Sequence, residues 1–385
     1  MRIYMDKRKL LYAAVVFFWF AQYVYIPFQT PYLAGMGISS QFIGVITGTY
    51  GVSQMILRLP VGIMADIRNR HKIFIITGGL SSGIASLFRI FLNSGAGFLL
   101  GNLFSGLASA MWISFMVLYM SYYGEAEQQK ATGRLVMANN IGMLLGFVVS
   151  TVFYDMAGME RICIMSVAGG LICALLAAGL PGGEEIRSGM SAKEVISICG
   201  NKRLIFFAIL ALIQQGVQMS TTMSFTSQIV KDVSSGSSMA VGVSSIIYML
   251  SAVIFAQAAT TGPCMRLGPG KCITAVFMLV AVYCLAVPHC SSLVIIYFLQ
   301  IIPGIATGIL AAYIISEAMK GIPAAKKSTA MGFFQAVYAI GMTVLPALCG
   351  KIADSCSMGV AYTVLAAICV AAGAAGYVFY ARKRA

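Results

Sequence analysis

Residues that could perform covalent chemistry are few in this chain, and their spacing does not form a catalytic set. The stretch GLSSG at Gly79–Gly83 fits the G-x-S-x-G pattern of hydrolases, but that motif needs a strand-to-helix turn and this copy lies inside a long apolar run. The two histidines, His71 and His289, fall at run ends on what should be opposite faces of a membrane, so neither could act as a base for Ser81. The ten cysteines form no C-x-x-C pair. We therefore predict that the chain is not an enzyme and has no cofactor or metal site.

Side-chain amides and hydroxyls recur at helical spacing in two apolar runs, and the chemistry they offer is hydrogen bonding to a solute. One set is Gln22, Tyr25 and Gln29, and the other is Gln214, Gln218 and Thr221. An amide in hydrocarbon is costly unless it has a partner, and a water-filled cavity would remove that cost. Hydrogen bonds between neighbouring helices would remove it as well. Both interpretations stay open for any single residue, but two such sets favour a cavity that binds a small molecule.

Three charged residues inside apolar runs have candidate roles. Arg58 could bind an anionic group of a substrate, or its role could be purely structural. Glu317 could carry a proton if desolvation raised its pKa, or it could pair with nearby cations such as Lys320. Arg89 lies near the end of its run, so we expect its long side chain to reach the membrane surface.

The composition is that of a membrane protein. Of the 385 residues, 59% are hydrophobic and only 10% are charged, and the mean hydropathy is +0.87. Soluble chains carry about 25% charged residues. The formal net charge of +14 would suggest nucleic-acid binding if the basic residues formed one patch. They fall instead in short clusters between apolar runs, so we expect membrane lipids and a small molecule as partners, and no nucleic acid.

Twelve apolar runs are long enough to cross a bilayer, which takes about 20 residues per helix. They are Leu10–Leu33, Gln41–Ala65, Ile73–Asn93, Ala96–Tyr123, Leu135–Ala157, Arg161–Leu180, Leu204–Val230, Ser238–Cys264, Cys272–Pro288, Leu293–Met319, Ala330–Lys351 and Met358–Tyr380. If both termini are cytoplasmic, most lysines and arginines fall on the cytoplasmic side. The sequence thus predicts an all-α, multi-pass protein of the cytoplasmic membrane, with both termini inside the cell.

Short matches recur between the two parts of the chain. GLAS at Gly106 returns as GIAT at Gly304, 198 residues later. Three further pairs are separated by 199 residues: Gly133 and Gly332, Gly142 and Gly341, and Asp155 and Asp354. A shared offset indicates an internal repeat, which is typical of transporters. We predict two six-helix bundles, residues 1–180 and 204–385, joined by a cytoplasmic linker at residues 181–203, in a monomeric protein.

The loop after the second run carries a motif that connects these features. Its residues match the pattern G-x-L-A-D-R-x-G-R-K at Gly62, Ala65, Asp66 and Arg70. The pattern departs at Ile67 and Asn69. With this motif, the number of runs, the two halves and the linker, the chain resembles the major facilitator superfamily over its whole length. The resemblance implies two pseudo-symmetric six-helix bundles, in which the first, fourth, seventh and tenth helices line a central cavity.

The same resemblance implies a gate. Asp66 would lie at the C-terminal end of the second helix, where the helix dipole disfavours an anion. The family pairs this acid with the positive N-terminal end of the eleventh helix, here near Ser328–Gly332. A glycine at position 62 would let the two helices approach closely. Since such a contact would form in one conformation and break in another, we assign Gly62, Asp66, Arg70 and Arg134 to gating.

The expected function is a secondary active transporter that moves a small organic solute by alternating access, with proton coupling left open. The candidate substrate-binding residues are Gln22, Tyr25, Gln29, Arg58, Gln214, Gln218 and Thr221, and Glu317 is the candidate proton carrier. A drug or metabolite efflux antiporter and a translocase for a lipid-linked substrate are the alternatives. Drug efflux is the weaker one, because the first run has no acid and the fifth lacks the expected Pro and paired glycines.

Overall fold

The chain is helical throughout the part that the computed structural model describes, residues 6–68, 71–123, 128–181, 197–258, 262–323 and 326–382. Apolar runs favour this because a helix pairs its backbone groups internally and needs no water to do so. The first helices are α1 (Lys7–Tyr23), α2 (Ile26–Gly35), α3 (Ser40–Arg68), α4 (His71–Leu92), α5 (Gly95–Ala110), α6 (Trp112–Ser121) and α7 (Gln128–Ala178). The later helices are α9 (Lys202–Ser220), α10 (Thr226–Val233), α11 (Ser238–Ala258), α12 (Gly262–Ala286), α13 (Leu293–Leu299), α14 (Ile301–Ile305), α15 (Ala311–Met319), α16 (Lys327–Ser355) and α17 (Met358–Ala381).

Polar side chains immediately before several helices fix where those helices begin. The carboxylate of Asp6 accepts a hydrogen bond from the backbone of α1, and Asn201 accepts two from the first turn of α9. Ser94 and Ser357 cap α5 and α17 in the same way. Each cap satisfies a backbone N–H that has no partner inside the helix.

Ten stretches of the described residues are long and apolar enough to cross a membrane. One of them, Arg134–Ala178, contains two helices, because α7 turns at Gly158, where φ is 69° and a side chain would be strained. Helix α3 has 29 residues but is not among the ten. The all-helical, multi-pass architecture is therefore confirmed, and twelve spans remain the expectation.

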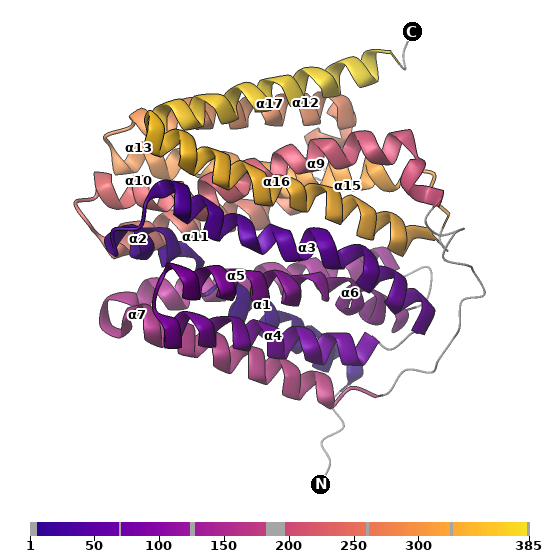
Figure 1. Ribbon diagram of the computed structural model, residues 1–385. Coiled ribbons are helices and arrows are strands. Elements are labelled where there is room, and N and C mark those ends of the chain that lie inside the picture. The colour runs from indigo at the N-terminus through magenta and orange to yellow at the C-terminus, as the bar shows by residue number, and fades with distance from the viewer. Residues whose placement is uncertain are drawn as a thin grey trace.

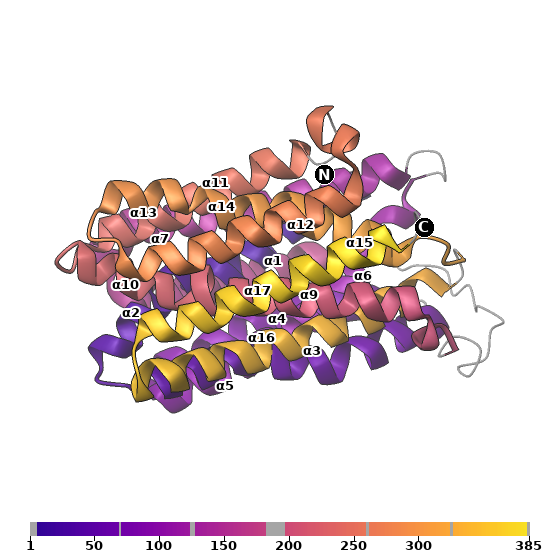
Figure 2. The same ribbon diagram turned by 90° about the horizontal axis from the view of Figure 1, so that it is seen from above.

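The helices run roughly along one direction and form two groups (Figures 1 and 2). Helices α1 to α7 form the N-terminal half, drawn from indigo to magenta, and α9 to α17 form the C-terminal half, drawn from pink to yellow. We call the end of the molecule where α1 begins and α17 ends the terminal end, and the opposite end, where α3 begins and α16 ends, the distal end. Residues 182–196, most of the expected linker, lie outside the described residues, so the linker and the exact bounds of the bundles remain predictions.

Helices α3 and α16 pack against each other along the seam between the halves (Figure 1). A Cβ added to Gly44 would collide with the carbonyl oxygen of Pro346, and one added to Gly350 would collide with that of Ser40. Nearer the terminal end, a Cβ on Gly332 would lie 3.5 Å from the carbonyl oxygen of Arg58. Small residues thus let the two backbones touch, which is how helices associate closely in membranes.

Replacing a seam glycine should weaken the contact between the halves. We expect Gly44→Val to destabilise the folded protein by about 1–3 kcal/mol, because the new side chain has to displace the backbone of α16. Thermal unfolding of the purified protein in detergent would measure this as a melting temperature lowered by several degrees.

Gly35→Val is the matched control, because a Cβ at Gly35 would meet no atom within 4 Å. Equal melting temperatures for the two variants would contradict close packing at the seam.

Candidate functional site

The four spans expected to line a cavity are the ones interrupted in the structure. The first breaks between α1 and α2, and the fourth between α5 and α6 at Met111. The seventh contains a π-helical turn at Thr221–Phe225, and the tenth contains another at Ala306–Leu310. Such irregular turns free backbone groups, redirect side chains, and mark binding sites in many transporters.

The polar residues predicted in the first span face other helices of the N-terminal half. The Gln22 amide donates to the Ser105 carbonyl oxygen at 2.9 Å, and the Tyr25 hydroxyl lies 3.3 Å from the Ser105 hydroxyl. Gln29 is 1% exposed, and its Oε1 has no hydrogen-bond partner, nor has that of Gln22. Gln22 and Tyr25 therefore join the first span to α5, while the amide oxygens of Gln22 and Gln29 are left available.

Arg89 is the centre of this polar cluster, and the expectation that it reaches the membrane surface is wrong. Its side chain is 2% exposed and donates to the Tyr25 hydroxyl, Asn102 Oδ1 and the Ser105 hydroxyl at 2.8–2.9 Å. Its guanidinium also lies 3.8 Å from the centroid of the Tyr25 ring. A set of polar acceptors on α2 and α5 thus holds the charge inside the half, at lower cost than extending it to the surface.

The predicted polar residues of the seventh span line a small pocket within the C-terminal half. Gln214, Gln218 and Thr221 face α12, α17 and the π turn of the tenth span across this pocket. The Gln214 amide donates to Gln218 Oε1, and the Gln218 amide donates to the Tyr248 hydroxyl at 2.7 Å. The two predicted sets thus each lie in their own half, and no hydrogen bond between described residues joins one set to the other.

A pair of hydroxyl contacts recurs at the same repeat offset in both halves. The Tyr50 hydroxyl donates to that of Ser109 at 2.9 Å, and the Tyr248 hydroxyl lies 3.1 Å from that of Thr307. Both members of the second pair follow the first by 198 residues. The bond from Ser53 to the Leu103 carbonyl recurs, with the same offset, as Ser251 to Ile301. The sequence repeat is therefore also a repeat of polar contacts.

Arg58 joins the two halves. Its guanidinium donates to the Tyr338 hydroxyl of α16 and lies 3.4 Å from the Ser109 hydroxyl of α5. The side chain is 3% exposed, and its Nε has no hydrogen-bond partner. The described residues offer it no carboxylate at ion-pair distance, since their one ion pair joins Arg203 and Glu317. A buried cation without a counter-ion is costly, and it is a candidate binding group for an anion.

One buried cluster of large side chains connects the halves around these hydroxyl pairs. It contains Tyr50 and Tyr248 together with aromatic and sulfur-containing side chains of both halves: Trp19, Met143, Phe147, Met219, Met223, Met249 and Met342. The side chains of Tyr23 and Tyr338 pack against it. Where a central cavity is expected, the described residues therefore form a packed cluster to which both halves contribute.

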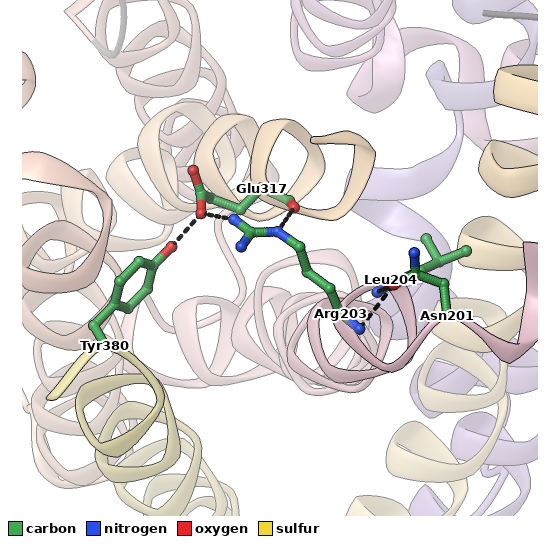
Figure 3. Close-up of polar contacts among 5 residues, drawn as sticks. All are labelled: Asn201, Arg203, Leu204, Glu317 and Tyr380. Carbon is green, nitrogen blue, oxygen red and sulfur yellow. Dashed lines mark hydrogen bonds and ion pairs between the residues drawn. The ribbon is translucent and has the colours of Figure 1, made fainter. Parts of the chain in front are cut away.

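Glu317 is an ion-pair partner in this structure (Figure 3). Its carboxylate accepts from the Arg203 guanidinium and from the Tyr380 hydroxyl, the latter at 2.7 Å. Arg203 also donates to the Glu317 backbone carbonyl, and Asn201 caps the helix that carries Arg203. Pairing with a cation was one of the two expected roles, but the cation is Arg203, from the start of α9, and not the expected Lys320.

Most of the predicted gating residues lie outside the part of the chain that the structure describes in full. For Gly62 and Asp66 only the backbone, in α3, is described, and Arg70 lies outside the described residues. Arg134 is exposed and approaches the Tyr123 hydroxyl at 3.4 Å. Gly332 of α16 lies against Arg58 of α3, so the beginning of α16 is close to the last turns of α3, as the gate requires.

The distal end has a contact that sequence reasoning did not find. Both carboxylate oxygens of Asp354, in the last turn of α16, accept backbone N–H bonds from the first turn of α3, from Ser40 at 3.0 Å and Gln41 at 2.7 Å. A carboxylate at a helix N-terminus is favourable for the hydrogen bonds and for the dipole. Asp354 had been singled out only as a repeat of Asp155, and nothing in the pattern identified its partner.

Tyr50, Tyr248 and Tyr338 were also missed. The first two stand 198 residues apart, so aligning the two halves of the sequence would have drawn attention to them. No signal in the sequence could have identified Tyr338 as the partner of Arg58, because that contact depends on how α3 meets α16. Among the described residues, no group of His, Cys, Asp and Glu side chains could hold a metal ion.

The fold is shared with solved transporters. A crystal structure of the nucleoside transporter NupG superposes with a TM-score of 0.75, over 98% of this chain and 99% of that one, at 15% sequence identity. A POT family transporter in complex with a thioalcohol-conjugated peptide superposes with a TM-score of 0.77, over 97% and 96% of the two chains, at 12% identity. At such low identities the likeness concerns the fold alone.

Curated relatives match a shorter part of the chain. An uncharacterised MFS-type transporter of Methanocaldococcus jannaschii is 26% identical over 138 residues, 35% of either chain. An uncharacterised transporter of Buchnera aphidicola is 25% identical over 134 residues, 35% of this chain and 34% of its own. The chain thus matches about a third of the length of these relatives.

The family model for the Major Facilitator Superfamily, in contrast, matches residues 11–282, most of the sequence, and this chain belongs to that superfamily of membrane transporters.

Proposed function

We propose that the protein is a secondary active transporter that moves a small organic solute across the cytoplasmic membrane by alternating access. The supporting observation is how the halves touch. Of the hydrogen bonds between the halves in the described part of the chain, all but Arg58–Tyr338 lie toward the distal end. They include Thr30 with Ser224 and Asp354 with the start of α3. The conformation is thus one in which the distal end is closed.

The distribution of basic residues gives this conformation a direction. Lysines and arginines gather between spans on the side that carries both termini, which favours a cytoplasmic terminal end. The distal end is then external, and a closed distal end belongs to a state that does not face outward. In such a transporter the external contacts have to break before the solute site can face outward.

The Asp354 contact is suited to be the external latch. It consists of two charge-assisted bonds to a helix N-terminus in the other half, so it is lost when the ends separate. Each bond is exposed to water, and a helix cap of this kind contributes about 1 kcal/mol. That is strong enough to bias two conformations and weak enough to be broken in each cycle.

Asp354→Asn should shift the protein toward an open distal end. The substitution removes the charge and leaves at least one backbone N–H of α3 without its acceptor, which changes the ratio of closed to open molecules roughly fivefold for about 1 kcal/mol. Met36 and Ser291 are exposed positions at the distal end of opposite halves. Double electron–electron resonance between spin labels at these two positions would detect a larger population of molecules with a long label-to-label distance.

Asp155→Asn is the matched control. Asp155 is the repeat equivalent of Asp354, but it is exposed and its carboxylate makes no hydrogen bond with the described residues. Its variant should keep the parent distance distribution. If Asp354→Asn does the same, the latch assignment is wrong.

The contact expected at the terminal end remains part of the proposal. Gly62, Asp66, Arg70 and Arg134 would stabilise the state that faces outward, by pairing Asp66 with the N-terminal end of α16. The register of α3 and α16 supports this, since Gly332 lies against Arg58 and the helices are antiparallel.

Asp66→Asn should reduce transport and leave the protein folded in the membrane. The neutral side chain cannot interact with the helix dipole as strongly, so the outward-facing state is populated less. Uptake into proteoliposomes, with melting temperature as the folding control, would measure both properties. Wild-type flux in this variant would remove Asp66 from the gate.

The surroundings of Glu317 disfavour proton coupling through this residue. Its carboxylate is already engaged by the Arg203 guanidinium and the Tyr380 hydroxyl, which is the arrangement of a structural ion pair. We expect Glu317→Gln to lower the melting temperature, because Arg203 loses its counter-ion, and to retain accumulation driven by a proton gradient. Lost accumulation at normal folding would instead identify Glu317 as the proton carrier.

Efflux of cationic drugs is disfavoured by the polar sets. None of the predicted substrate-binding residues is an acid, and the buried Glu317 is occupied by Arg203. A lipid-linked substrate remains an alternative. Time-dependent accumulation of a soluble solute in proteoliposomes would favour the transporter over a lipid translocase.

A further inference from the structure

Two hydrogen-bond donors on the side of the central cluster that belongs to the N-terminal half have no partner. Arg58 Nε and Trp19 Nε1 are both buried and have no acceptor. Leaving a donor without a partner in a buried site costs free energy, so each such group calls for an explanation, such as a ligand present in another state. Trp19 is part of the cluster, and Arg58 contacts Tyr338, which packs against it. Two unpaired donors therefore lie beside the same buried cluster, together with one positive charge to which the described residues offer no carboxylate.

The C-terminal half contributes neutral polar groups at the equivalent place. Tyr248 repeats Tyr50, but Ala256 stands 198 residues after Arg58, so the charge is not repeated. Thr307 donates its hydroxyl proton to the Pro303 carbonyl, so it accepts the bond from Tyr248, while the Gln218 amide donates to Tyr248. This side thus carries an amide and hydroxyls, and the site is electrostatically asymmetric.

The buried cluster beside these polar groups contains side chains suited to contact a flat apolar body. Trp19 and the two tyrosines present aromatic surface, which packs against planar groups. Met219, Met223, Met249 and Met342 are flexible and polarisable, so they can adapt to a ligand. The buried Arg58 is positively charged, so a cationic ligand would meet a like charge.

From these observations we propose that the transport site takes an aromatic monocarboxylate with a neutral polar group at its far end. The carboxylate binds Arg58 beside Tyr50 and Tyr338, the ring replaces the methionine side chains, and the far group bonds to Gln218 and Tyr248. The inference rests on the proposed transport function and specifies its substrate class. A carboxylate suits Arg58 because the planar guanidinium can donate two parallel bonds to it.

A purely structural role for these residues makes a different prediction. If Arg58 served only to join α3, α5 and α16, ligands of equal size would affect the protein equally whatever their charge. Ligand charge therefore separates the two roles without any change to the protein.

Thermal unfolding of the purified full chain with benzoate, benzamide and benzylamine makes that comparison, since the three share a ring and differ in charge. Benzoate should raise the melting temperature in a saturable way, and 4-hydroxybenzoate should do so at lower concentration. Benzamide and benzylamine should have little effect. Equal effects of all three, a stronger effect of benzylamine, or no effect of benzoate would each overturn the proposal.

Variants assign the two ends of the ligand. Arg58→Gln should weaken benzoate binding about tenfold or more, as expected for a lost charge-assisted pair, while Arg58→Lys, which keeps the charge, should retain part of the binding. Arg161→Gln, at an exposed arginine, is the matched control and should bind as the parent does. Tyr248→Phe should remove the advantage of 4-hydroxybenzoate over benzoate. If Arg58→Gln folds and binds benzoate normally, or if Tyr248→Phe keeps that advantage, the assignment fails.

Failure of this inference and failure of the proposed function give different results. If the protein in liposomes accumulates a neutral solute and does not bind aromatic acids, the substrate class is wrong and the transporter stands. If it binds the acids but neither accumulates nor exchanges radiolabelled benzoate across the liposome membrane, the site assignment stands and the transport function is wrong.

Discussion

The backbone contact between α3 and α16 is the interaction on which the arrangement of the two halves depends. Gly44, Gly48 and Gly350 let the backbones of these antiparallel helices touch near the distal end, and the helices still lie side by side at the level of Arg58 and Gly332. Helix α7 meets α11 with a similar fit, where Gly242 lies against Thr151. Because a glycine contact contains no interlocking side chains, two helices can roll on it over small angles without losing it. Such a seam would serve as the axis about which the ends of the halves separate, while the polar contacts at those ends form and break.

The polar interior follows from a second constraint, which is that each buried polar group needs a partner in hydrocarbon. Each half meets it by the same contacts, the tyrosine hydroxyl with Ser109 or Thr307, and a serine with a backbone carbonyl of a neighbouring helix. The halves differ in charge. The N-terminal half holds Arg58 and Arg89 with hydroxyl and amide acceptors, and the described residues give neither a carboxylate partner. A shared scaffold with unequal charge would allow the proposed site to distinguish the two ends of a substrate.

The sequence was sufficient for the helical fold, the internal repeat and the family, because these depend on long apolar runs, a shared offset and a loop motif. The polar residues it selected, Gln22, Gln214 and Thr221, lie in or near two of the spans that have irregular turns. What it could not predict were contacts that depend on tertiary geometry. Arg89 was expected at the surface because its run ends nearby, but Asn102 and Ser105 on α5 provide acceptors inside. Likewise Asp354 and Glu317 find partners, Ser40 and Arg203, from segments distant in sequence.

The most direct test of the account measures both ends of the molecule in the same preparation. Spin-label distances between Met36 and Ser291 would report the distal end, and distances between Lys9 and Lys202, exposed at the terminal end, would report the other. Rocking about the α3–α16 seam predicts that any condition that lengthens one distance shortens the other. Distances that change together, or a terminal distance that stays constant while the distal one changes, would contradict it.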